Sequence, residues 1–138
     1  MATKQTTWKL KYKSKLRIID LVFSGNVTGS DIREATSKTI SLSHEHGIFE
    51  ILVDTAHLER TETTTDIYDL PQQYVEEDLD HRSRLAVVVP ISPDLQGIMQ
   101  FYENVCVNRG WRVKSFPNRR EATAWLLTNT TSSESPDG

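Results

Sequence analysis

Two short apolar runs limit what this chain can fold into. They are residues 48–55 (IFEILVDT) and residues 84–90 (RLAVVVP), and both carry apolar side chains at neighbouring as well as alternate positions. A strand that is apolar on both faces needs cover on both sides, as in the middle of a parallel sheet. A helical pattern between the runs supplies the crossover that parallel neighbours require. We therefore predict an α/β protein with both runs at the centre of its sheet.

The amino-terminal part of the chain predicts two further strands and a helix. Residues 8–12 alternate apolar side chains with lysines, which indicates an edge strand, where charge discourages pairing with another chain. Residues 16–23 form a second strand after a hairpin, and Ser24-Gly25-Asn26 has the composition of a turn. A capping box at residues 28–31 opens a helix that Gly47 ends.

The carboxyl-terminal part alternates helices and strands. Residues 56–62 are expected to form a turn, and the helix after them is divided into two pieces by Pro71. Ser92-Pro93-Asp94 is a strong helix start. Residues 111–116 alternate as an outer strand, and a second capping box, at residues 118–121, opens the last helix.

The resulting order of elements is β-β-α-β-α-β-α-β-α. It predicts a single domain over residues 8–127, built on a mixed, mainly parallel five-stranded sheet, with polar, flexible termini at residues 1–7 and 128–138. Composition excludes several classes of protein. The net charge of −3 argues against a nucleic-acid binder, and no apolar segment reaches the roughly 20 residues of a membrane span. A single cysteine and an amino terminus without an apolar signal core indicate a cytoplasmic protein.

The predicted crossovers also bear on association. Crossovers that all step the same way across a sheet put their helices on one face, which leaves the other face of the central strands short of cover. Trp8, Tyr12 and Trp111 would extend that apolar surface if they point the same way, and such a patch predicts a homodimer. The alternative is a monomer, in which the helix after Asn118 folds over the second face.

Candidate site residues follow the carboxyl end of the strand at residues 48–55, where sites of open α/β sheets tend to lie. Asp54 either belongs to such a site or binds local backbone N–H groups. Three threonines near the next helix start either accept a phosphate or serve as its N-cap and solvated neighbours. The full set of candidates for binding a partner or ligand is Asp54, His57, Thr63, Thr64, Thr65, Tyr68, Leu70 and Tyr74, with Thr63, Thr64 and Thr65 as the candidates for phosphorylation.

No catalytic or metal-binding motif is present in the sequence. It contains no Gly-rich phosphate loop, GxSxG, CxxC or HExxH, so we expect no catalytic residue, cofactor or metal. His44 and His46 lie two residues apart on a helix and point in different directions, so they do not chelate one ion together. His57 with Glu59 is either an acid–base pair or a pair of exposed turn residues, and Cys106 is expected to be a small buried hydrophobe.

The order of elements and three stretches of sequence together resemble a known family. The stretches are LRIIDLVFSGNVTGSDIREA, a strand ending in LVDT and a helix reading TDIYDLP. On these features the chain resembles the STAS superfamily of anti-sigma factor antagonists and its bacterial SpoIIAA-like group. The resemblance covers about residues 8–127 and implies a non-enzymatic module that binds a protein partner. In the superfamily, a serine in an Asp-Ser-Ser-Gly motif after the third strand is phosphorylated. Residues 62–66 here read Glu-Thr-Thr-Thr-Asp, so that switch does not carry over residue by residue.

Three functions are therefore carried forward. The first is a non-catalytic regulatory or protein-interaction module, with its site between residues 54 and 74. The second is a carrier of a small apolar ligand or lipid, as in the related Sec14-like fold, using Tyr68, Leu70, Tyr74 and the apolar side of the helix at residues 93–109. An enzyme of unknown type is third. Acids gather in residues 59–80 and bases in residues 109–120, which suits a charged partner or a second copy.

Overall fold

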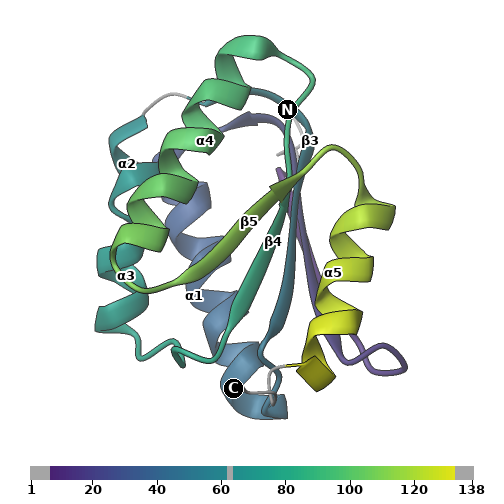
Figure 1. Ribbon diagram of the computed structural model, residues 1–138. Helices are drawn as coiled ribbons and strands as arrows, with labels where there is room; N and C mark the ends of the chain where they lie inside the picture. Colours follow the sequence, from purple (N-terminus) through teal and green to yellow (C-terminus); the bar gives the residue numbers. More distant parts are fainter. Residues whose placement is uncertain (1–6, 62–63, 133–138) are drawn as a thin grey trace, which may run out of the picture.

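The computed structural model describes residues 7–61 and 64–132, which form one five-stranded sheet with helices on both faces (Figure 1). The strands are β1 Trp8–Lys13, β2 Ile18–Val27, β3 Glu50–Thr61, β4 Arg84–Val88 and β5 Arg112–Phe116. The helices are α1 Gly29–His46, α2 Thr64–Tyr68, α3 Leu70–Glu76, α4 Pro93–Asn108 and α5 Arg119–Ser132. The strands lie in the order β1-β2-β3-β4-β5, with β1 antiparallel to β2 and all other neighbours parallel. The predicted fold class and order of elements are confirmed.

The helices divide between the two faces of the sheet. In Figure 1, α1, α2, α3 and α4 cover one face, as crossovers of one hand require, and α5 alone lies on the other. Val87 and Val88 point to opposite faces, and each is only 1% exposed. The expectation that the second face lacks cover is wrong for the central strands, because Ala122 and Leu126 of α5 pack there.

The aromatic side chains expected to extend an open second face lie elsewhere. Trp8 and Tyr12 of β1 pack against the core on the α1–α4 side, and Trp111 is buried in the same core. The three side chains on the second face of β1 are Lys9, Lys11 and Lys13, all exposed. The apolar patch on which the homodimer was predicted is therefore not formed by these residues.

Two predicted turns are strand in the structure. Residues 24–26 belong to β2 and residues 56–61 to β3, because the two strands continue to pair beyond their apolar segments. The pairing is interrupted by register shifts at Val22/Ser24 and Gly25/Asn26, and Gly25 has a φ of +74°. The glycine therefore forms part of a β-bulge, where a positive φ is favoured just as it is in a turn.

Helix ends agree closely with the sequence. Thr28 and Asp31 form the predicted reciprocal capping box, and Gly47 ends α1 in the left-handed conformation. The helix that contains Pro71 is divided as predicted, with the break at Asp69. The last helix continues to Ser132, past the expected boundary at residue 127. No described helix combines the length and the apolar character needed to cross a membrane.

Candidate functional site

The sheet separates the candidate site residues into two groups. Asp54 points to the second face, toward α5, where Arg119 binds it. Leu70 and Tyr74 of α3 lie on the first face and line an internal cavity, so the residues between positions 54 and 74 do not form one site. The reason is the alternation of side chains along β3, which sends Val53 and Thr55 to the cavity and Asp54 away from it.

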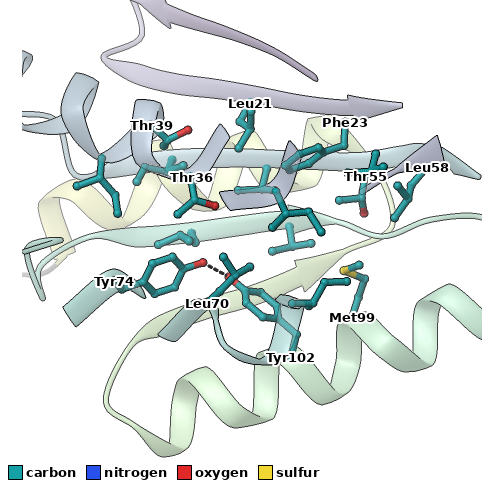
Figure 2. A pocket seen from close by; sticks show the side chains of 18 of the residues that line it. Leu21, Phe23, Thr36, Thr39, Thr55, Leu58, Leu70, Tyr74, Met99 and Tyr102 are labelled. Carbon is teal, nitrogen blue, oxygen red and sulfur yellow. Dashed lines mark hydrogen bonds between the residues drawn. The ribbon is translucent and has the colours of Figure 1, made fainter. Parts of the chain in front are cut away.

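An apolar cavity of about 70 Å³ lies between the first face of the sheet and the helices (Figure 2). Its floor is formed by side chains of β2, β3 and β4, and its walls by α1, α2, α3 and α4. Among the labelled lining residues are Leu21, Phe23, Thr36, Thr39, Thr55, Leu58, Leu70, Tyr74, Met99 and Tyr102. Voids larger than one water molecule are few in protein interiors, so a cavity of this volume is a candidate ligand site.

Four of the hydroxyl groups that line the cavity are paired inside the protein. The hydroxyls of Tyr74 and Tyr102 lie 2.5 Å apart in a hydrogen bond, drawn in Figure 2. Thr39 donates to the carbonyl of Ala35 at 2.8 Å, and Thr55 donates to the carbonyl of Val88 at 2.6 Å. Burial raises the pKa of Tyr74 and the pKa of Tyr102 well above the ordinary value, so both phenols stay neutral.

Cys106 adjoins the tyrosine pair and is fully buried. Burial raises the pKa of its thiol to about 12, and the hydrogen bond with Tyr102 offsets only part of that rise. A thiol with so high a pKa is not a nucleophile at neutral pH. The prediction of a small buried hydrophobe is confirmed.

An ion-pair network occupies the second face beside α5. Arg119, the first residue of α5, donates to Asp54 Oδ2 at 2.7 Å and to Asp20 Oδ2 at 2.6 Å. Lys13 lies 3.0 Å from the same Asp20 oxygen. Both carboxylates are buried, and Asp54 also accepts the backbone N–H of Ala56 at 2.9 Å. Asp54 therefore makes the contact with a local backbone N–H group that the structural alternative describes, whereas its role in a binding site stays a prediction.

The threonine candidates lie at the start of α2. Thr64 and Thr65 open this helix, whereas Thr63 lies outside the described residues. Thr65 is exposed and precedes Asp66, which forms an ion pair with Arg33 of α1. The helix has only five residues, so its dipole gives little help to an added phosphate.

The histidines make separate local contacts. His57 is exposed on β3, where a turn was expected, and Glu59 follows two residues later on the same exposed side. His46 stacks on Tyr12, and His44 contacts the carbonyl of Asp78 at 2.8 Å. Within the part of the chain that the structure describes, no three His, Cys, Asp or Glu side chains are grouped to hold a metal ion.

An aromatic pair, an exposed Phe101 and a half-buried Tyr68, lies on the helical face outside the cavity. Phe101 of α4 is 51% exposed and meets Tyr68 of α2 edge-on, with ring centroids 4.7 Å apart. On the other side of α2 and α3, toward α1, is an open groove. The charged side chains that line it are Arg33, Glu34, Asp66, Asp69, Glu76 and Glu77. We call the pair and the groove together the α2 surface.

Sequence reasoning missed Asp20, Arg119 and Phe101. Asp20 lies within an apolar strand and is buried. Because a buried carboxylate needs a cationic partner, its position in the sequence already indicated that a lysine or arginine from elsewhere in the chain would bind it. In the sequence Arg119 is one of several bases in residues 109–120, and nothing there links it to a buried acid. Phe101 lies off the apolar face of its helix, and a single apolar residue at such a position is ordinary on a protein surface, so it carried no signal of a binding site.

Comparisons with known proteins agree with this architecture. A family model described as SpoIIAA-like matches residues 18–127. The chain is similar to the structure of the anti-sigma factor antagonist SpoIIAA in its unphosphorylated form, with a TM-score of 0.56 and 15% identity over 86% of this chain and 96% of that one. It is also similar to an uncharacterised DUF3478-family protein with a SpoIIAA-like fold from Shewanella loihica PV-4, with a TM-score of 0.58 and 15% identity over 91% of this chain and 98% of that one.

The search of curated proteins gave no match. At 15% identity the two solved structures bear on the fold alone. The family model spans most of the chain, from the start of β2 into α5. The chain therefore belongs to the SpoIIAA-like family.

Proposed function

We propose that this protein is a non-catalytic interaction module that binds a protein partner through the α2 surface. The observation that carries the proposal is the Tyr68–Phe101 pair, in which an exposed Phe101 lies against a half-buried Tyr68. Large aromatic side chains are enriched at the centres of protein interfaces, where they dominate the binding energy. The proposal agrees with the family's regulatory members, and one residue of the pair, Tyr68, belongs to the stretch of residues 54–74 that the sequence indicated.

The charge around this pair indicates the chemistry of the partner. Asp69 and Glu76 line the groove beside α2 and α3. Among the described residues neither forms an ion pair, whereas Asp66 pairs with Arg33. Acidic side chains on one side of an apolar pair favour a partner that carries basic side chains beside its own apolar contact, because complementary charges steer the encounter. The partner is therefore expected to present an apolar side chain flanked by lysine or arginine.

The test compares two variants of α4. Phe101 and Val107 are each 51% exposed, so Phe101→Ala and Val107→Ala remove apolar side chains of equal exposure from one helix. A partner isolated with the wild-type protein from cells of the source organism should bind Phe101→Ala about 30-fold more weakly, as expected for an interface hot spot of about 2 kcal/mol. Its affinity for Val107→Ala should be unchanged. Equal affinities for the two variants would remove Phe101 from the interface.

The cavity favours a second candidate function, the binding of a small apolar molecule. Its volume of about 70 Å³ is about half that of an engineered cavity, roughly 150 Å³, that binds benzene. A lipid chain is therefore too large for the cavity as it stands. Xenon is a suitable probe, and the methyl signal of Met99, which lines the cavity, should shift when xenon is added. An unchanged Met99 signal in the folded protein would exclude this function.

The homodimer stays a prediction, although the apolar patch from which it was predicted is not formed by Trp8, Tyr12 and Trp111. Light scattering on a sizing column decides the oligomeric state, because the chain mass is 15.8 kDa. A mass near that value at tens of micromolar protein would exclude the dimer.

A further inference from the structure

The outer edge of β1 is unpaired in the described part of the chain. β1 is an edge strand, bonded to β2 in an antiparallel ladder. The N–H of Ser24 donates to the carbonyl of Thr7, which shows that Thr7 faces β2. Backbone groups of an antiparallel strand alternate between its two sides, so the N–H and C=O groups of Trp8, Leu10 and Tyr12 point outward. No hydrogen bond from residues 7–61 or 64–132 reaches them.

At β5, the other edge of the sheet, a side chain covers part of the backbone. On β5, the carboxylate of Glu103 from α4 accepts the backbone N–H of Ser115 at 3.0 Å. A free N–H on a sheet edge is a template for pairing with another chain, and this contact removes one from β5. β1 has no equivalent cover among the described residues, so it is the less protected edge of the sheet.

The side chains of β1 define what such a strand must carry. Lys9, Lys11 and Lys13 form an exposed row on the second face of the sheet. Lys13 pairs with Asp20, but Lys9 and Lys11 have no ion-pair partner within the described residues. On the first face, Trp8, Leu10 and Tyr12 are only partly buried against the core. An added strand would meet a basic row on one face and an apolar row on the other.

We propose that β1 is a docking edge for an extended segment of a protein partner in which acidic and apolar residues alternate. Backbone hydrogen bonds to Trp8, Leu10 and Tyr12 would supply affinity, as in other cases of strand addition. The acidic side chains would lie beside Lys9 and Lys11, and the apolar side chains would cover Leu10 and its neighbours on the first face.

The lysine row also decides against a second copy of β1. Two such strands would bring lysines opposite one another, and like charges directly opposite destabilise a sheet. The row that deters self-pairing therefore selects an acidic strand instead. This edge is separate from Phe101 of the α2 surface, because α4 packs against β5 at the far side of the sheet. The inference requires that the protein bind a partner but does not depend on the Tyr68–Phe101 contact.

The test uses a blocked synthetic peptide of about eight residues, typical of a strand, in which glutamate and valine alternate. Residue-resolved amide hydrogen exchange of the full chain should show that the peptide protects Trp8, Leu10 and Tyr12 and leaves Val113 of β5 unchanged. Lys9→Glu/Lys11→Glu should weaken binding about ten-fold or more, since two attractive cross-strand pairs become repulsive. The matched control, Arg112→Glu/Lys114→Glu on β5, makes the same change in net charge and should leave the affinity unaltered.

Two further peptides separate strand addition from simple charge attraction. An N-methylated form of the glutamate–valine peptide keeps its charges but loses backbone donors, so it should bind at least ten-fold more weakly. A lysine–valine peptide should bind Lys9→Glu/Lys11→Glu and not the wild-type protein. Equal binding of the N-methylated peptide, no protection of β1, or an equal loss in the β5 variant would each overturn the proposal. Protection of Leu10 and Tyr12 in the free protein would do so too, because the edge would already be occupied.

Discussion

Arg119 is expected to stabilise the protein by joining two buried carboxylates under α5. Its Nη1 and Nη2 atoms lie 2.7 Å from Asp54 and 2.6 Å from Asp20, and these acids are only 4% and 5% exposed. The informative change is Arg119→Met, which keeps an unbranched apolar stem and removes the charge. The matched control is Arg82→Met, because Arg82 forms an ion pair with Asp80 on the surface.

The magnitude follows from what each acid retains. Removing one partner of a buried ion pair costs about 3–5 kcal/mol. Here the side chain of Arg119 is 40% exposed, Asp20 keeps Lys13, and Asp54 keeps the N–H of Ala56. Solvent screening and these remaining contacts lower the expected loss to about 2 kcal/mol. In urea the midpoint of unfolding should therefore fall by about 1 M. Arg82→Met should leave the midpoint unchanged, because the Arg82–Asp80 pair is exposed to water.

The pH dependence provides a second measurement. Burial alone would raise the pKa of Asp20, but hydrogen bonds from Arg119 and Lys13, with their charges, more than offset this and hold the pKa below its ordinary value. A carboxyl with a lowered pKa in the folded state stabilises the protein above its unfolded pKa of about 3.9, and that contribution is lost as the pH falls through the folded value. The difference between wild type and Arg119→Met should therefore be largest at about pH 7 and should shrink toward about pH 3.

Two outcomes would refute this reasoning. One is a loss in Arg119→Met no larger than in Arg82→Met, which would mean that the buried carboxylates find other partners. The other is an equal loss at both pH values, which would assign the effect to packing instead of charge. Addition of Asp20→Asn and Asp54→Asn to Arg119→Met should restore part of the stability, because no buried charge is then left unpaired.

Five further substitutions test the core and the start of α1. Val87→Asp and Val88→Asp should each lower the free energy of unfolding by several kcal/mol, since both faces are covered; an unchanged melting temperature for either would mean that its face is open to water. Thr28→Ala should cost about 1 kcal/mol through loss of the capping box, whereas a cost near zero in urea unfolding would show that water replaces the cap. Tyr74→Phe and Tyr102→Phe should each cost about 1–2 kcal/mol, and a double-mutant cycle should give less than the sum; strict additivity would mean that the 2.5 Å contact carries no coupling.

Local chemistry was sufficient to predict the elements and several of the helix ends. The capping box at Thr28, the left-handed Gly47 and the division of a helix near Pro71 each depend on a few neighbouring residues, and all three are in the structure. The two apolar runs predicted central strands because a buried strand needs apolar side chains on both faces. The family resemblance came from the same ordered elements.

The candidate site was predicted less well, because its geometry depends on residues far apart in the chain. The segment from residue 54 to residue 74 contains both Asp54 and Tyr74, but the pleat of β3 places them on opposite faces of the sheet. The turn expected after Thr55 became strand because β2 supplies a paired, bulged neighbour as far as Val27. Nothing in the sequence of residues 56–61 indicates that β2 extends far enough to pair with them.

The sequence by itself determined the number, kind and order of the elements, because capping, proline and hydrophobic periodicity act over a few residues. Only the tertiary structure decided which surfaces are covered. It placed α5 over the second face, turned Trp8 and Tyr12 toward the first, and brought Arg119 to Asp20 and Asp54. These arrangements are set by strand pairing and packing between distant segments, and the energy that favours them appears only when the whole sheet has formed.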